Sequence, residues 1–263
     1  MFLKKQILLW SSILIFQCVQ SQKNNHPVDT LPEIKNITTP VLSIFDSPLM
    51  VPQRSAVAHT SLSYKEIQKL NNGQDMTYIL RFTPSLVATS DAGTGIGYTG
   101  LWIRGSDPSR INVTINNVPL NDAESQQVFW VNLPDLASSA QFIQIQRGAG
   151  PSTAGPGAFG GSIHINTIDQ SIQAPSKISY QSTAGSFNTF KRTLQLDRIR
   201  LPFQWVFSGR ASEITSDGYI DRAHANLKGY QASVQRNGQS KWGNWKALLT
   251  SFGGNERTYQ SWN

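Results

Sequence analysis

The chain has 263 residues, enough for one or two domains, and a formal net charge of +7. Only 15% of the residues are charged, below the roughly 25% typical of soluble domains, which favours turn-rich β structure and a surface that does not face water alone. The net positive charge lies from Lys177 onward, where 12 Lys and Arg outnumber 5 Asp and Glu. Because these cations are single residues within alternating strands, we expect them on solvated strand faces and turns, and we expect no nucleic-acid partner.

Residues 1–21 predict a secretory signal peptide. Two lysines precede the largely apolar run Gln6–Phe16, which is shorter than the roughly 20 residues of a membrane-spanning helix. The small side chain of Ser21 marks a cleavage site near that residue. Cys18, the only cysteine, also allows a lipoprotein cleavage site, but Gln17 is a poor fit to the small residue expected before a lipidated cysteine. We therefore expect an exported mature chain without disulfides.

Residues 22–58 predict an extended arm. The five prolines of this segment exclude long helices, and the irregular sequence is typical of a linker. Within the arm, Glu33–Thr38 alternates between polar and apolar residues. This stretch is a candidate strand that can add to the edge of a partner's sheet.

Residues 59–170 predict a small α+β domain of short strands and helices. Ser63 and Glu66 have the spacing of a capping box, which begins a helix through Leu70. Asp75 begins a second helix, which Thr83-Pro84 ends. Alternating and turn-forming residues predict strands at Leu86–Ala88, Ile111–Ile115 and Phe142–Arg147, a turn at Asn116-Asn117 and a helical turn at Leu133–Leu136.

Two glycine-rich stretches have the spacing of nucleotide-binding motifs. Gly95–Gly100 matches GxGxxG, and Gly155 and Gly160 are spaced as in a phosphate loop. The first stretch runs into the strand-like Leu101–Arg104, and the second runs into the alternating Ser162–Thr167 with glycine where lysine should stand. Both motifs need a helix N-terminus to hold the phosphate. We therefore expect packing contacts of the backbone rather than nucleotide binding.

Residues 171–263 predict antiparallel strands of a transmembrane β-barrel. Apolar and polar residues alternate in runs of roughly ten, as in barrel strands. A soluble sandwich shows the same alternation, but the signal peptide and the aromatic content favour the barrel. Turns are expected at Ala184–Ser186, Arg200–Pro202, Asp217-Gly218 and Asn237-Gly238.

Four motifs in order carry a resemblance to a known family. They are Asp75–Pro84 (DMTYILRFTP), Leu101–Gly105 (LWIRG), Val113–Asp122 (VTINNVPLND) and Ile145–Thr167 (IQRGAGPSTAGPGAFGGSIHINT). In order and spacing the series resembles the plug domain of TonB-dependent outer-membrane receptors, and the resemblance continues more weakly into the strands. In that family a barrel of about 22 strands encloses a lumen that the folded plug closes.

The resemblance implies roles for particular residues. The arginines Arg104 and Arg147 match plug arginines that pair with carboxylates on the inner barrel wall, as a latch. Residues Gly148, Gly160 and Gly161 would form the turn from plug to barrel. Two loops would face outward and contact substrate through Thr94, Ile96, Tyr98, Asp122, Ser125 and Gln126. In the arm, contact with the energy transducer TonB would fall to Glu33, Ile34, Ile37 and Thr38.

The function that the resemblance implies is TonB-driven import across the outer membrane. The expected cargo is a ferric siderophore or another iron complex, although relatives carry vitamin B12, carbohydrate or peptides. The expected partners are TonB and membrane lipid, with no catalytic residue, metal ligand or cofactor. The rivals are an exported surface binding or adhesion protein and an exported enzyme, but the four histidines lack metal-ligand spacing.

The length of the strand region also predicts incompleteness. About 90 residues follow the predicted plug, which suffices for roughly six to eight strands. We therefore expect an N-terminal fragment of a receptor, without transport activity alone.

Overall fold

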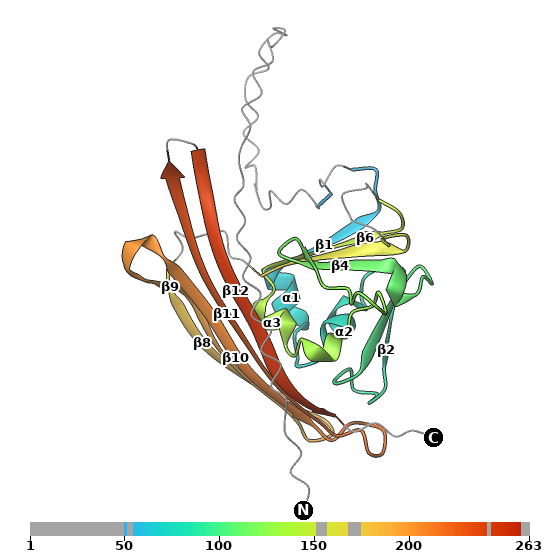
Figure 1. Cartoon of the computed structure of the whole chain (residues 1–263). Coiled ribbons are helices and arrows are strands. Elements are labelled where there is room, and N and C mark those ends of the chain that lie inside the picture. The colour runs from blue at the N-terminus through green and yellow to red at the C-terminus, as the bar shows by residue number, and fades with distance from the viewer. Residues whose placement is uncertain (1–49, 52–54, 151–156, 168–174, 241–242, 259–263) are drawn as a thin grey trace, which may run out of the picture.

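The computed structural model describes residues 50–51, 55–150, 157–167, 175–240 and 243–258. The predicted signal peptide and the candidate strand Glu33–Thr38 lie outside the described residues. The described chain forms an N-terminal domain (residues 50–167) and a curved antiparallel sheet (residues 177–258), whose concave side holds the domain (Figure 1). In the described part of the chain, no helix is both long and apolar enough to cross a membrane.

The N-terminal domain is built on a five-stranded sheet in the order β1-β6-β7-β4-β5. Its strands β4 and β7 are parallel, and the other neighbouring pairs are antiparallel. Isoleucines at alternate positions of β4, β6 and β7 are almost fully buried and form the core with the helices. The strands are β1 (His59–Ser63), β4 (Ile111–Ile115), β5 (Val118–Pro119), β6 (Phe142–Arg147) and β7 (Gly161–Asn166).

The opposite face of this sheet is polar and still buried. His164 is 1% exposed; its Nδ1 lies 2.9 Å from the Thr114 hydroxyl and its Nε2 lies 3.1 Å from the Ser162 hydroxyl. The Ser162 hydroxyl also donates to Gln146, so it accepts from Nε2 and leaves Nδ1 to accept from Thr114. Burial lowers the pKa of His164 to about 4. The imidazole is therefore neutral at physiological pH.

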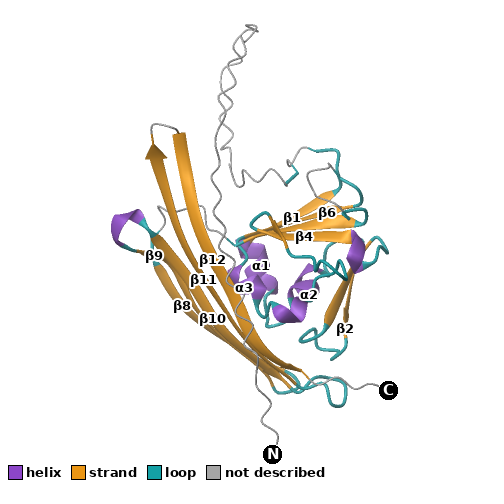
Figure 2. Cartoon of the chain, in the orientation of Figure 1, coloured by secondary structure: helices purple, strands orange, loops and turns teal. Residues whose placement is uncertain are grey.

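Short helices and a hairpin cover the core face (Figure 2). The predicted capping box is confirmed, because Glu66 accepts hydrogen bonds from the Ser63 backbone and hydroxyl at 2.7 and 2.6 Å. Asp75 is the N-cap residue of α2, as the sequence predicts. The elements are α1 (Tyr64–Leu70), α2 (Met76–Leu80), β2 (Leu86–Ser90), β3 (Thr99–Ile103), η1 (Pro108–Arg110), η2 (Trp130–Asn132) and α3 (Leu136–Ser139).

The N-terminal domain begins before its first strand. Val51 is 4% exposed, and its backbone makes two hydrogen bonds with the side-chain amide of Gln144, at 2.6 and 2.9 Å. The amide acts here like a peptide group of a neighbouring strand. The end of the predicted arm is therefore bound to the sheet eight residues before His59.

The curved sheet has the order β12-β11-β10-β9-β8, with every neighbouring pair antiparallel. The predicted turn at Asn237-Gly238 is wrong, because both residues pair with β12 near the turn end of a long hairpin, whose ladder continues to Ser240. A turn, η4 (Pro202–Gln204), joins two of the strands. The strands are β8 (Lys177–Gly185), β9 (Thr189–Arg200), β10 (Val206–Ser216), β11 (Ala225–Ser240) and β12 (Gly243–Thr258).

The two faces of the curved sheet differ in the way that the sequence predicts for a barrel wall. Large apolar side chains are exposed on the convex side, among them Ile178, Tyr180, Phe190, Leu194 and Tyr230. The alternate positions of β9, β10 and β11 are mostly polar and lie buried towards the N-terminal domain, although Ile214 and Leu227 on this face are apolar. A sheet that is apolar outside and polar inside suits lipid on one side and a filled lumen on the other.

Candidate functional site

Asp135 is the centre of the contact between the N-terminal domain and the curved sheet. It precedes α3 with a left-handed backbone (φ 55°), a conformation that aspartate tolerates better than most residues. Its side chain is 1% exposed. Lys191 of β9 places its Nζ 2.6 Å from Oδ1, and Arg210 of β10 places its Nη1 3.2 Å from Oδ2. Thr193 of β9 donates to Oδ2 at 3.0 Å.

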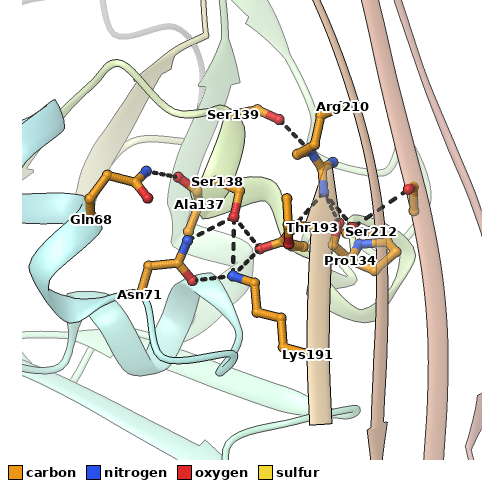
Figure 3. A network of polar contacts seen from close by, with 12 residues as sticks. Gln68, Asn71, Pro134, Ala137, Ser138, Ser139, Lys191, Thr193, Arg210 and Ser212 are labelled. Atoms are coloured by element: carbon orange, nitrogen blue, oxygen red, sulfur yellow. Dashed lines mark hydrogen bonds and ion pairs between the residues drawn. The ribbon is translucent and has the colours of Figure 1, made fainter. Parts of the chain in front are cut away.

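A second layer of polar groups satisfies the remaining donors of the two cations (Figure 3). Lys191 donates to Asn71 Oδ1 at 2.7 Å and to the Ser138 hydroxyl at 3.1 Å. Ser138 in turn donates to Asp135 at 2.6 Å. Arg210 donates through Nε to Ser139 at 2.6 Å and through Nη1 to Ser212 at 2.7 Å. Groups from α1, α3, β9 and β10 thus meet in one closed network.

Electrostatics keep Asp135 ionised in this buried position. Burial opposes its charge, but the Lys191 ammonium, the Arg210 guanidinium and the hydrogen bonds from Lys191 and Ser138 outweigh burial and lower the pKa of Asp135. Because the desolvation of three charges offsets much of their attraction, such a cluster adds little net stability, whereas removal of one partner is costly. This makes the cluster a latch that fixes one position of the domain.

The loop of residues 91–98 makes a second contact with the curved sheet. Tyr219, in the loop between β10 and β11, donates its backbone N–H to the Ala92 carbonyl at 2.9 Å. Its ring packs edge-on against Phe187 at 5.4 Å between centroids. Of the three residues predicted here to contact substrate, Tyr98 is 41% exposed and Thr94 is half-buried.

The prediction for Ile96 does not fit the structure. Its side chain is 2% exposed and belongs to an apolar cluster with Val131 of η2 and with Ile214, Ala225 and Leu227 of the curved sheet. A branched apolar side chain in a loop gains most by packing, here against the sheet. Ile96 therefore anchors the loop to the curved sheet.

The second predicted substrate loop is closed by its own hydrogen bonds. Asp122 accepts from the Ser125 backbone and hydroxyl, at 2.7 and 2.9 Å, and these bonds lower the pKa of Asp122. Asp122 and Gln126 are exposed, and Ser125 is half-buried. Their contact with substrate stays a prediction.

The predicted latch arginines lie elsewhere than the cluster. Arg147 is half-buried and donates to the carbonyls of Pro84 and His59, both within the N-terminal domain. Arg104 is exposed at the end of β3. Within the described ranges, neither arginine forms an ion pair, and the pairs that join domain and sheet have the opposite polarity, with the carboxylate on the domain.

The predicted turn glycines pack inside the N-terminal domain. A Cβ on Gly160 would lie 2.4 Å from the Ser106 Cβ, and one on Gly161 would lie 2.5 Å from the Gln146 carbonyl. The Gly148 N–H donates to Gly160 O at 2.8 Å. These glycines bring the chain into β7, so the passage to the curved sheet begins only after that strand. Their assignment to the exit turn is wrong, although close backbone approach is the right reason for glycine.

Three central residues of the latch were not singled out by the sequence. The sequence pattern places Asp135 only in a helical turn. It predicts solvated positions for Lys191 and Arg210, but their side chains are buried, with exposed fractions of 0% and 6%. Alternation along β9 gives a signal for Lys191. Phe190 and Leu194 point outward, and because successive side chains of a strand point to opposite faces, Lys191 points inward. Alternation assigned Lys191 to the inner face, but it does not show what fills the lumen.

A polar cleft adjoins the latch. The N-terminal domain lines it with Ser139, Gln141 and Thr167, and the curved sheet lines it with amide and hydroxyl side chains of β9, β10 and β11. Asp197 and Arg210 are its charged lining groups. Arg210 therefore belongs both to the buried cluster and to the cleft between domain and sheet.

Comparison with known proteins defines the class. Residues 51–162 match the family model described as the TonB-dependent Receptor Plug Domain. The match begins at the residue bound by Gln144 and ends in β7. The match identifies residues 51–162 as a plug domain of this type, and the antiparallel strands of the curved sheet follow it in the structure.

Individual relatives are distant. The chain is 24% identical over 190 residues to hemoglobin and hemoglobin-haptoglobin-binding protein A of Haemophilus influenzae, an alignment that covers 68% of this chain and 17% of that protein. Among solved structures, the copper transporter OprC gives a TM-score of 0.60 at 16% identity, over 80% of this chain and 33% of that one. The ferric citrate transporter FecA, unliganded, gives 0.58 at 17% identity, over 78% and 32%. At these identities the structures show a shared fold.

Proposed function

We propose that the chain is part of an outer-membrane importer that takes up a scarce ligand, most concretely a ferric siderophore or another iron complex. The observation that carries this proposal is the match of residues 51–162 to the plug family together with their seating on the polar side of the curved sheet. A plug held in a lumen by a removable latch is suited to gated passage. Two of the three relatives support the choice of iron, since they are named for ferric citrate and for hemoglobin, whereas the third is named for copper.

In this proposal the chain performs no bond chemistry. The ligand binds at the end of the receptor that carries Tyr98 and Tyr219, with Thr94, Asp122, Ser125 and Gln126 as further contacts. TonB pulls on the arm, residues 22–58, through Glu33, Ile34, Ile37 and Thr38. The force enters the plug at Val51, where Gln144 holds the backbone, and the plug then shifts to open a path.

Deletion of residues 22–49, which keeps Val51 bound to Gln144, tests the proposal. The full-length receptor is expressed with its signal peptide, and cells are supplied with ferric citrate or hemoglobin as the iron source. We expect binding at the cell surface to persist while uptake is lost, because the plug stays seated without a pulling force. Unchanged uptake would contradict energy coupling through the arm. If cells bind the ligand at their surface but never need the receptor to obtain iron, the result would instead favour a surface binding protein.

A further inference from the structure

The inner side of the curved sheet directs three hydrogen-bond donors at a single carboxylate. Lys191 and Thr193 stand two residues apart on β9, and Arg210 reaches the same point from β10. They contact the two oxygens of Asp135 at 2.6, 3.0 and 3.2 Å. All three donors belong to the sheet, and the acceptor belongs to the plug. The sheet therefore supplies three donors to a carboxylate, whereas the plug groups Asn71, Ser138 and Ser139 accept further hydrogen bonds from the two cations.

The charges of this site do not balance. Lys191 and Arg210 bring two positive charges, and Asp135 brings one negative charge. Asp197 lines the adjoining cleft with Arg210, but it accepts from Gln195 at 2.9 Å and, in the described part of the chain, forms no ion pair with Arg210. Burial raises the pKa of Asp75, a buried plug carboxyl on which Asp135 acts electrostatically, well above its ordinary value. The site therefore keeps an excess of positive charge that favours an anion.

The cost of emptying the site depends on what replaces Asp135. If the plug moves away alone, Lys191 and Arg210 lose their shared carboxylate, and separating the partners of a buried ion pair is costly. An anion that enters the site removes this cost. Because Arg210 lines the polar cleft, the site can be reached along the boundary between plug and sheet.

We propose that Lys191, Thr193 and Arg210 form a carboxylate-binding site on the inner face of the barrel wall, which Asp135 fills at rest and a carboxylate of the transported ligand fills when the plug shifts. The cargo carboxylate thus takes the place of Asp135 and lowers the free energy of the displaced state. A ligand acts on such an equilibrium only through its different affinity for the two states. The transport step rests on the proposed function, whereas the carboxylate site does not.

Chemical rescue tests the site. Asp135→Gly removes the carboxylate at a position whose left-handed backbone glycine adopts without strain. The receptor is purified in detergent, and its Tm is measured in sodium acetate and in sodium chloride at equal ionic strength. We expect the variant to have a lowered Tm that acetate raises saturably, by roughly 2–4 °C at a few times its Kd. Wild type should show no acetate effect, because Asp135 occupies the site.

Glu213→Ala is the matched control, since it also removes a carboxylate from a lysine. Glu213 pairs with Lys228 at 3.2 Å, but the two side chains are 38% and 60% exposed. The Tm of the Glu213→Ala variant should be insensitive to acetate. Equal effects of acetate and chloride on Asp135→Gly, or an equal acetate effect on Glu213→Ala, would overturn the proposal. If Asp135→Gly is not recovered folded, its refolding yield in the two salts provides the same comparison.

The outcome separates this site from the proposed function. Acetate rescue with uptake that does not need the arm would leave the site standing and refute TonB-driven import. Absence of rescue with arm-dependent uptake would refute the site and leave import standing.

Discussion

Replacement of Lys191 by methionine tests whether the latch holds the plug. Methionine keeps the length and the apolar stem but removes three contacts of Nζ, to Asp135, Asn71 and Ser138 at 2.6, 2.7 and 3.1 Å. Removal of one partner from a buried ion pair costs about 3–5 kcal/mol. Because Arg210 still neutralises Asp135, we expect the lower end, about 3 kcal/mol. A loss of about 3 kcal/mol makes the locally open state of the variant roughly 100-fold more populated than that of the wild type.

Amide hydrogen exchange measured by mass spectrometry gives the opening free energy of α1 and α3 locally. Peptides from these helices should exchange roughly 100-fold faster in Lys191→Met, whereas peptides from β8 should be unchanged. The control is Lys228→Met, which breaks the exposed pair with Glu213 and should cost less than about 1 kcal/mol. Equal exchange rates of α3 in the two variants would refute the latch.

Three further predictions concern the plug itself. Gly160→Val should abolish plug folding, because its Cβ would lie 2.4 Å from Ser106, whereas Gly185→Ala should not; protease resistance of the plug measures both. The pKa of His164 falls from 6.5 to about 4 on folding. The contribution of the neutral imidazole to the free energy of unfolding is therefore fully present above pH 6.5 and is lost as the pH falls towards 4. A His164→Asn variant should lack this pH dependence in urea titrations. Ser63→Ala should destabilise α1 by about 1 kcal/mol, seen as faster exchange of its first turn, and unchanged exchange would argue against the cap.

The local signals of the sequence predicted the plug elements well. The capping box at Ser63, the helix start at Asp75 and the strand Phe142–Arg147 all depend on neighbours within a few residues, and the structure confirms them. Asn237-Gly238 shows the limit of such signals. This pair is typical of a hairpin turn, but both residues pair with β12 in a ladder that continues two residues further, to Ser240, so strand pairing prevails over local preference.

The latch was beyond sequence reasoning for a different reason. The pattern at Lys191 and Arg210 shows which face of a strand they occupy, but the pKa and burial of a side chain depend on what the fold places opposite it. Asp135 lies more than 50 residues from both partners, and no spacing rule connects them. The pairing of Arg104 and Arg147 with carboxylates of a barrel wall stays a prediction.

The most direct test of TonB-driven import is the accumulation of radiolabelled iron in iron-starved cells that express the full-length receptor, with and without functional TonB. Iron is supplied in the complex, ferric citrate or hemoglobin, that the receptor binds at the cell surface. Import driven through the plug predicts equal surface binding in both strains and accumulation inside the cell only where TonB is present. Equal accumulation in the two strains would contradict it.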